Sequence, residues 1–208
     1  MENSEKKLEA LMGNEIHKTV EWKDDKDKKH TTKITLQDPG IGVATQVMDL
    51  MNVGDDTSDY GKAFELLMQN VLVSPHLNYG TLNHDLPEKL NKKTIVKQNS
   101  AGDEVKINMV FPGYRTALQI FMMTNRPSGA LNMHDTLDSL DKEVLRTDES
   151  TPQIVKMRYW NVGGHGSGLG ATALSEAQTY LGTLLARNGL LNILMEAFRF
   201  LATTLRPK

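Results

Sequence analysis

The sequence predicts an α+β fold of two related units, each a β-hairpin followed by two helices, with a C-terminal strand and helical extension. Three observations predict it. Segments 33–47 and 106–120 match without a gap at an offset of 73 residues, both end a hairpin-like pattern, and both lead into helical periodicity. Lys, Ile, Pro, Gly, Ala and Gln recur at matching places, and the apolar phase continues downstream.

The two hairpins are expected over 19–36 and 94–109, where apolar and polar residues alternate on both sides of a turn-rich tip. The predicted tips are 24–30 and 99–103, so the first should be two residues longer. Each unit alone has about 55 residues, which is near the lower limit for independent folding. We therefore expect the two hairpins to share a sheet or to pack as neighbours.

Helices are expected after Pro39 and Pro112, because proline suits the first turn of a helix that follows a strand. Apolar residues then recur at spacings of three and four, and we interpret them as core. In the first unit these residues are Ala44, Val47, Met48, Met51, Tyr60, Ala63, Phe64, Leu67 and Val71. In the second unit they include Ala117, Ile120, Phe121, Leu137, Leu140 and Val144.

The C-terminal region differs from the rest in charge. Residues 154–208 carry six basic and two acidic side chains, a net +4, so residues 1–153 carry −6 of the total of −2. A strand over 154–162, a glycine run over 163–170, and helices over 171–187 and 190–205 are expected there. We therefore divide the chain into an N-terminal helical or flexible segment (1–17), two units (18–92 and 93–150) and the C-terminal region (151–208).

The last predicted helix has the sharpest apolar stripe in the chain, and such stripes are usually core. Its terminal position, the local positive charge and the glycine run before it also allow a partner-binding helix, with Arg187 and Arg199 as rim charges. The candidate partner-binding residues are Leu191, Leu194, Met195, Phe198 and Leu201.

Composition excludes some classes of chemistry. With no cysteine among 208 residues, thiolate metal sites, disulfides and cysteine nucleophiles are excluded, and the near-neutral charge argues against a nucleic-acid binder. The glycine run resembles a dinucleotide loop, but no ribose-binding carboxylate follows at a second strand. Neither a metal site nor a cofactor is expected, and without a signal or membrane-length apolar span we expect a cytoplasmic protein.

The segment from Thr32 to Tyr79 resembles the tail assembly chaperones of long-tailed phages and prophages of Gram-positive bacteria. The resemblance rests on the Pro39-led helix and on the sequence from Ala63 to Pro75, with its Phe-x-x-Leu and Val-x-Pro pattern. It implies a non-enzymatic protein that self-associates, coats the tape measure protein during tail assembly and leaves as tail tube subunits arrive. In longer members of that family a C-terminal extension often arises by translational frameshifting, and residues after Thr151 resemble one.

Two alternatives from other classes remain. One is a structural protein of the virion, such as a tail or connector subunit. The other is a nucleotide-binding enzyme that uses the loop 163–170.

Overall fold

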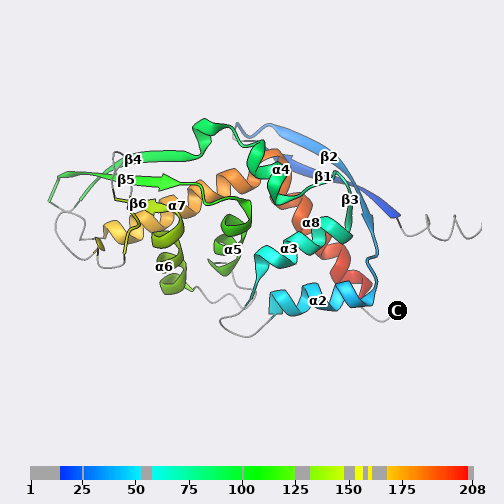
Figure 1. Ribbon diagram of the computed structural model, residues 1–208. Coiled ribbons are helices and arrows are strands. Elements are labelled where there is room, and N and C mark those ends of the chain that lie inside the picture. The colour runs from blue at the N-terminus through cyan, green and yellow to red at the C-terminus, as the bar shows by residue number, and fades with distance from the viewer. Residues whose placement is uncertain are drawn as a thin grey trace, which may run out of the picture. The chain divides into compact units, whose positions relative to one another are not determined.

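The computed structural model describes residues 15–24, 26–52, 58–99, 101–124, 132–147, 153–156, 159–160 and 168–205. Within them the predicted α+β class is confirmed, with two separate three-stranded antiparallel sheets in place of one shared sheet. The chain divides into two compact units (Figure 1). Unit 1 comprises 1–81 and 186–208, and unit 2 comprises 82–185. No described helix has the length and apolar character that crossing a membrane requires.

Unit 1 is a three-stranded sheet covered by helices. Its strands lie in the order β1-β2-β3, and α8 packs against β1, β2 and α3. Buried side chains from the sheet and the helices form its core, with Leu36, Phe64 and Leu194 fully enclosed. Its elements are β1 (Glu15–Lys23), β2 (Lys29–Gln37), α2 (Ile41–Asn52), α3 (Tyr60–Asn70), β3 (Leu72–Ser74), the 3-10 helix η4 (Arg187–Gly189) and α8 (Leu190–Thr204). Helix α4 (Tyr79–His84) spans the boundary between the units.

Unit 2 has the strand order β4-β5-β6. Helix α7 contacts its elements through an ion pair between Lys97 and Glu176 and a hydrogen bond from the Tyr180 hydroxyl to the Leu90 carbonyl. Its elements are the 3-10 helix η1 (Glu88–Leu90), β4 (Lys92–Gln98), β5 (Glu104–Val110), α5 (Tyr114–Thr124), α6 (Met133–Glu143), β6 (Leu145–Arg146) and α7 (Leu169–Ala186).

Equivalent elements of the two units stand 73 residues apart. Helices α2 and α5 begin at residues 41 and 114, α3 and α6 at 60 and 133, and β3 and β6 at 72 and 145. The same spacing relates two backbone hydrogen bonds of 2.8 Å, from Gln37 to Val71 and from Val110 to Val144. It also relates Gly40 and Gly113, which both adopt a positive φ just before a helix.

The predicted difference in hairpin tips is wrong, because both loops have five residues, 24–28 and 99–103. In each loop a side-chain oxygen of the first residue, Asp24 or Asn99, accepts hydrogen bonds from two backbone N–H groups within the loop. The first hairpin is longer in its arms instead, which pair over nine residues against seven in the second. The two hairpins therefore differ in the length of their arms and not in the length of their loops.

The C-terminal region is not one segment in the structure. Helix α7 belongs to unit 2 up to Leu185, and α8 belongs to unit 1. The strand predicted over 154–162 is not formed by the described residues there, which make only an isolated bridge between Arg146 and Ile154. Of the predicted N-terminal segment, residues 1–14 lie outside the described part and 15–17 begin β1. The division of the chain thus follows spatial packing, and differs from the four consecutive regions of the sequence analysis.

Candidate protein-binding groove

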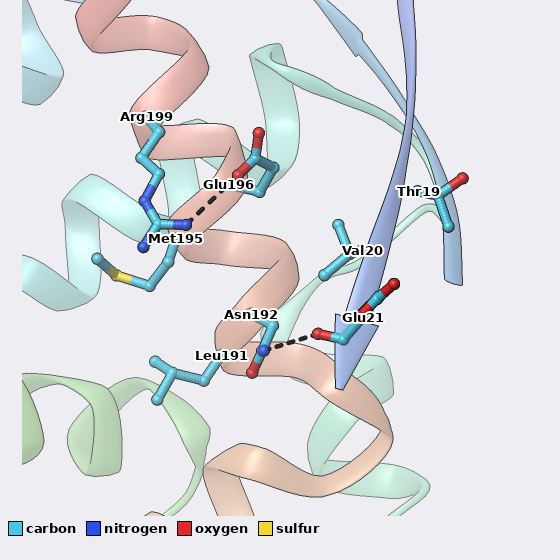
Figure 2. A pocket seen from close by; sticks show the side chains of 8 residues that line it. All are labelled: Thr19, Val20, Glu21, Leu191, Asn192, Met195, Glu196 and Arg199. Atoms are coloured by element: carbon cyan, nitrogen blue, oxygen red, sulfur yellow. Dashed lines mark hydrogen bonds and ion pairs between the residues drawn. The ribbon is translucent and has the colours of Figure 1, made fainter. Parts of the chain in front are cut away.

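A pocket of about 390 Å³ lies between β1 and α8 in unit 1 (Figure 2). Figure 2 shows Val20 directed from β1 toward α8, whereas Thr19 is directed away from the helix. The lining combines aliphatic groups, charged groups and the strand backbone. Its members are Thr19, Val20, Glu21, Leu191, Asn192, Met195, Glu196 and Arg199.

The start of α8 is placed by a close approach to Trp22 on β1. Asn188 and Gly189 have φ values of 53° and 71°, and this left-handed pair, the last two residues of η4, leads directly into α8. One turn further, the Asn192 amide donates a 3.0 Å hydrogen bond to the backbone carbonyl of Glu21. These contacts hold the helix along the strand and set the width of the groove.

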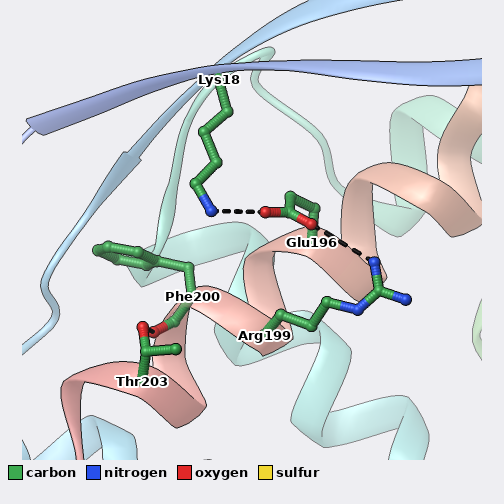
Figure 3. A network of polar contacts seen from close by, with 5 residues as sticks. All are labelled: Lys18, Glu196, Arg199, Phe200 and Thr203. Carbon is green, nitrogen blue, oxygen red and sulfur yellow. Dashed lines mark hydrogen bonds and ion pairs between the residues drawn. The ribbon is translucent and has the colours of Figure 1, made fainter.

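A charged network lies at the middle of α8 (Figure 3). The Lys18 ammonium is 2.6 Å from one Glu196 carboxylate oxygen, and the Arg199 guanidinium is 3.5 Å from the other. The hydrogen bond from Lys18 lowers the pKa of Glu196, against a smaller opposing effect of burial. Glu196 is therefore ionised at neutral pH and neutralises Lys18. Arg199 has a 71% exposed side chain, so its charge faces solvent at the groove.

Among the described residues, no strand pairs with the backbone edge of β1 beside the groove. Within that part of the chain β1 pairs with β2 alone, and the bond from Asn192 shows that the Glu21 carbonyl points away from β2. In an antiparallel strand the N–H and C=O of one residue point to the same side, and residues two apart share that side. The odd-numbered residues of β1 therefore present their backbone groups at the free edge.

The structure divides the five candidate partner-binding residues into two sets. Leu194 and Leu201 are 0% exposed in the core of unit 1, so they offer no surface to a partner while the unit is folded. Leu191 and Met195 line the groove, and Phe198 is half-buried on α8 outside the lining. Arg199, expected as a rim charge, also lines the groove.

The strand side of the groove was missed by sequence reasoning. Thr19, Val20 and Glu21 lie about 170 residues before α8, and no local pattern indicates that the two segments meet. The predicted alternation of apolar and polar residues over 19–23 agrees with the structure, in which Val20 is buried whereas Thr19, Glu21 and Lys23 are exposed.

Other candidate chemistry is not built up by the described residues. Glycines 163, 164 and 166 lie outside the described part, Gly168 directly precedes α7, and Gly170 is the second residue of that helix. A Cβ on Gly170 would lie 3.2 Å from Trp160, so this glycine permits close packing. Among the described residues no three His, Asp or Glu side chains are grouped to hold a metal ion.

Comparison with protein-family models, with curated proteins and with solved structures finds no match to this chain.

Proposed function

We propose that this protein is a non-catalytic tail assembly chaperone that binds the tape measure protein and keeps it soluble before assembly. The observation that carries the proposal is the groove of unit 1, where a free strand edge lies beside aliphatic side chains and an exposed guanidinium. Backbone groups at a strand edge bind extended polypeptide of many sequences, and neighbouring pockets add preference for particular side chains. A chaperone needs such tolerance.

The location of the family resemblance supports the proposal. The segment from Thr32 to Tyr79 forms most of β2, then α2, α3 and β3, all within unit 1. Of these elements, β2 and α3 pack against α8, so the resembling segment supports one wall of the groove.

We also propose that units 1 and 2 are two copies of one ancestral unit. The 73-residue spacing of element boundaries and of equivalent backbone hydrogen bonds supports this. On this proposal α8 in unit 1 and α7 in unit 2 play comparable parts, since an inward lysine of the edge strand pairs with a glutamate of the helix in each.

Binding to the tape measure protein is tested by co-expression with fragments of that protein and pull-down. Met195→Asp places a charge in the aliphatic part of the groove and should reduce recovery at least tenfold. Met133→Asp, at a 53% exposed position on α6, is the matched control and should bind as wild type does. Arg199→Glu is a second groove variant. The Arg199 side chain is 71% exposed, so this substitution should not unfold the protein.

Equal recovery with both groove variants would refute the assignment of the groove. Presence of the protein in purified tail particles would favour a structural virion protein, because a chaperone leaves before the tail is complete.

A further inference from the structure

The free edge of β1 carries a charge pattern that is complementary to itself. Its edge-facing residues are, in order, Glu15, His17, Thr19, Glu21 and Lys23, all with exposed side chains on one face. If a second copy of β1 runs antiparallel about a two-fold axis at Thr19, Glu15 lies opposite Lys23 of the second copy. His17 then lies opposite Glu21, and Thr19 lies opposite itself.

The backbone agrees with this register. A two-fold axis at Thr19 sets odd-numbered residues opposite odd-numbered residues, and these are the residues whose N–H and C=O groups face the free edge. Each such pair can then exchange two backbone hydrogen bonds, as the hydrogen-bonded pairs of an antiparallel ladder do.

Neighbouring registers are disfavoured by charge. Sliding the second strand by two residues in one direction sets Glu15 opposite Glu21 at both ends of the ladder. Sliding it in the other direction sets His17 opposite Lys23 and moves Glu15 beyond the end of the second strand, so both Glu15–Lys23 pairs are lost. Like charges directly opposite each other destabilise a strand pair, whereas opposite charges stabilise it. Of these three registers, the one about Thr19 is the one in which each carboxylate faces a suitable partner. Glu15 faces Lys23, and Glu21 faces His17.

We propose that β1 pairs with β1 of a second copy about a two-fold axis at Thr19, which joins two three-stranded sheets into one six-stranded sheet. The contact uses the same patch on both copies, as closed two-fold dimers do. It deepens the self-association included in the proposed function, and it is measured without any tape measure protein, so either proposal can fail alone.

Two side chains next to the edge, Lys18 and Asn192, also influence how strong the pairing is. An inward-pointing lysine on an edge strand normally opposes pairing, but Glu196 neutralises Lys18 here. Asn192 acts the other way, because its amide occupies the Glu21 carbonyl that the second strand would use. Asn192→Ala should therefore strengthen self-association.

The test is sedimentation velocity of the full chain over a concentration series at low ionic strength. Wild type should show a monomer–dimer equilibrium, and Lys23→Glu should raise its Kd at least tenfold, because the two-fold axis creates two Glu–Glu pairs. The double variant Glu15→Lys with Lys23→Glu exchanges the charges and should restore Kd to within about threefold of wild type. Lys33→Glu, exposed on β2 away from the edge, is the control.

A second measurement is independent of charge. The chain has no cysteine, so Thr19→Cys introduces one thiol, which should be cross-linked to its symmetry mate by a short bis-maleimide. Thr31→Cys, exposed on β2, should not be cross-linked. A wild-type protein that is monomeric at all concentrations would overturn the proposal. So would a dimer whose Kd is unchanged by Lys23→Glu and whose Thr19→Cys variant is not cross-linked.

Discussion

The indole of Trp22 on β1 lies so close to Gly189 that a Cβ at residue 189 would be 2.5 Å from Trp22 Cδ1. The same glycine has a φ of 71°, which side-chain-bearing residues seldom adopt. The indole is held in place by a 2.9 Å hydrogen bond to Thr32 and by stacking on His30. This contact therefore acts together with the Asn192–Glu21 hydrogen bond to set how α8 begins and how it meets the sheet.

Gly189→Ala should destabilise unit 1 by about 2–5 kcal/mol, from backbone strain together with overpacking against a rigid ring. Chemical denaturation followed by circular dichroism measures this. Gly42→Ala is the control, because Gly42 is helical with open space around it. This substitution should raise the free energy of unfolding by about 0.5–1 kcal/mol. A neutral Gly189→Ala would show that α8 can shift without cost.

Removal of residues 186–208 should unfold unit 1 and leave unit 2 folded. α8 buries Leu190, Ile193, Leu194, Phe200 and Leu201, and each such side chain contributes about 1.5–3 kcal/mol by burial. Together they are comparable with the whole stability of a domain. Hydrogen exchange should show loss of protection in β1 and β2 and retained protection in β4 and β5. Retained protection throughout would mean that α8 is a dispensable extension.

Because of Asp141, the stability of unit 2 should fall as the pH rises above 3.8, the ordinary pKa of an aspartate side chain. Asp141 is 1% exposed, one oxygen accepts a 2.8 Å bond from the Trp160 indole, and the other has no hydrogen-bond partner among the residues that the structure describes. Burial raises its pKa above 3.8, so the folded state holds the proton where the unfolded state has lost it. Stability therefore declines from about that pH until Asp141 is ionised in the folded state too.

Asp141→Asn keeps an acceptor for Trp160 and removes the titration, so its stability curve should be flatter over this window. Denaturant unfolding between pH 3.5 and 7 compares it with wild type, and Asp49→Asn, exposed on α2, controls for a general effect of charge. Parallel curves for wild type and Asp141→Asn would contradict the prediction.

The pKa of Asp24 in the first hairpin loop should depend on its contact with His30. Its Nε2 atom lies 2.8 Å from Asp24 Oδ2, and this bond is the largest cause lowering the pKa of Asp24 to about 2. His30→Phe keeps a ring beside Trp22 but removes the bond, so the pKa of Asp24 should rise toward 3.8. Carboxyl NMR titration measures it. In wild type the contribution of the Asp24–His30 contact to folding stability is present above about pH 4, and it disappears as the pH falls toward 2. Lys28→Ala, which keeps the backbone donor to Asp24, should leave the pKa low.

The tape measure protein and a second copy should compete, because both proposals use the β1 edge. Adding a tape measure fragment that binds should convert the dimer to monomer–fragment complexes in sedimentation experiments. Asn192→Ala frees the Glu21 carbonyl for either partner, so it should strengthen both the dimer and the binding of the fragment. A complex that contains the intact dimer would place the fragment elsewhere.

Local patterns in the sequence indicated most elements but not their partners. Alternation marked the hairpin arms, and Pro39 and Pro112 marked where helices follow strands. The second tip was predicted correctly, but the first was predicted two residues too long, because Lys29 and His30 are polar and yet pair with Lys23 and Trp22 as part of β2. The strand predicted over 154–162 failed among the described residues, because a run of apolar residues does not by itself supply a neighbouring strand.

The sequence alone determined the α+β class, the 73-residue spacing and the strong amphipathic character of α8, because these depend on neighbours within a few residues. Only the tertiary structure decided that α8 completes unit 1, that Leu194 and Leu201 are core, and that β1 has a free edge beside a groove. Those outcomes depend on contacts such as Lys18 with Glu196, 178 residues apart. An amphipathic stripe requires burial, but what covers it is chosen by the packing of the whole unit.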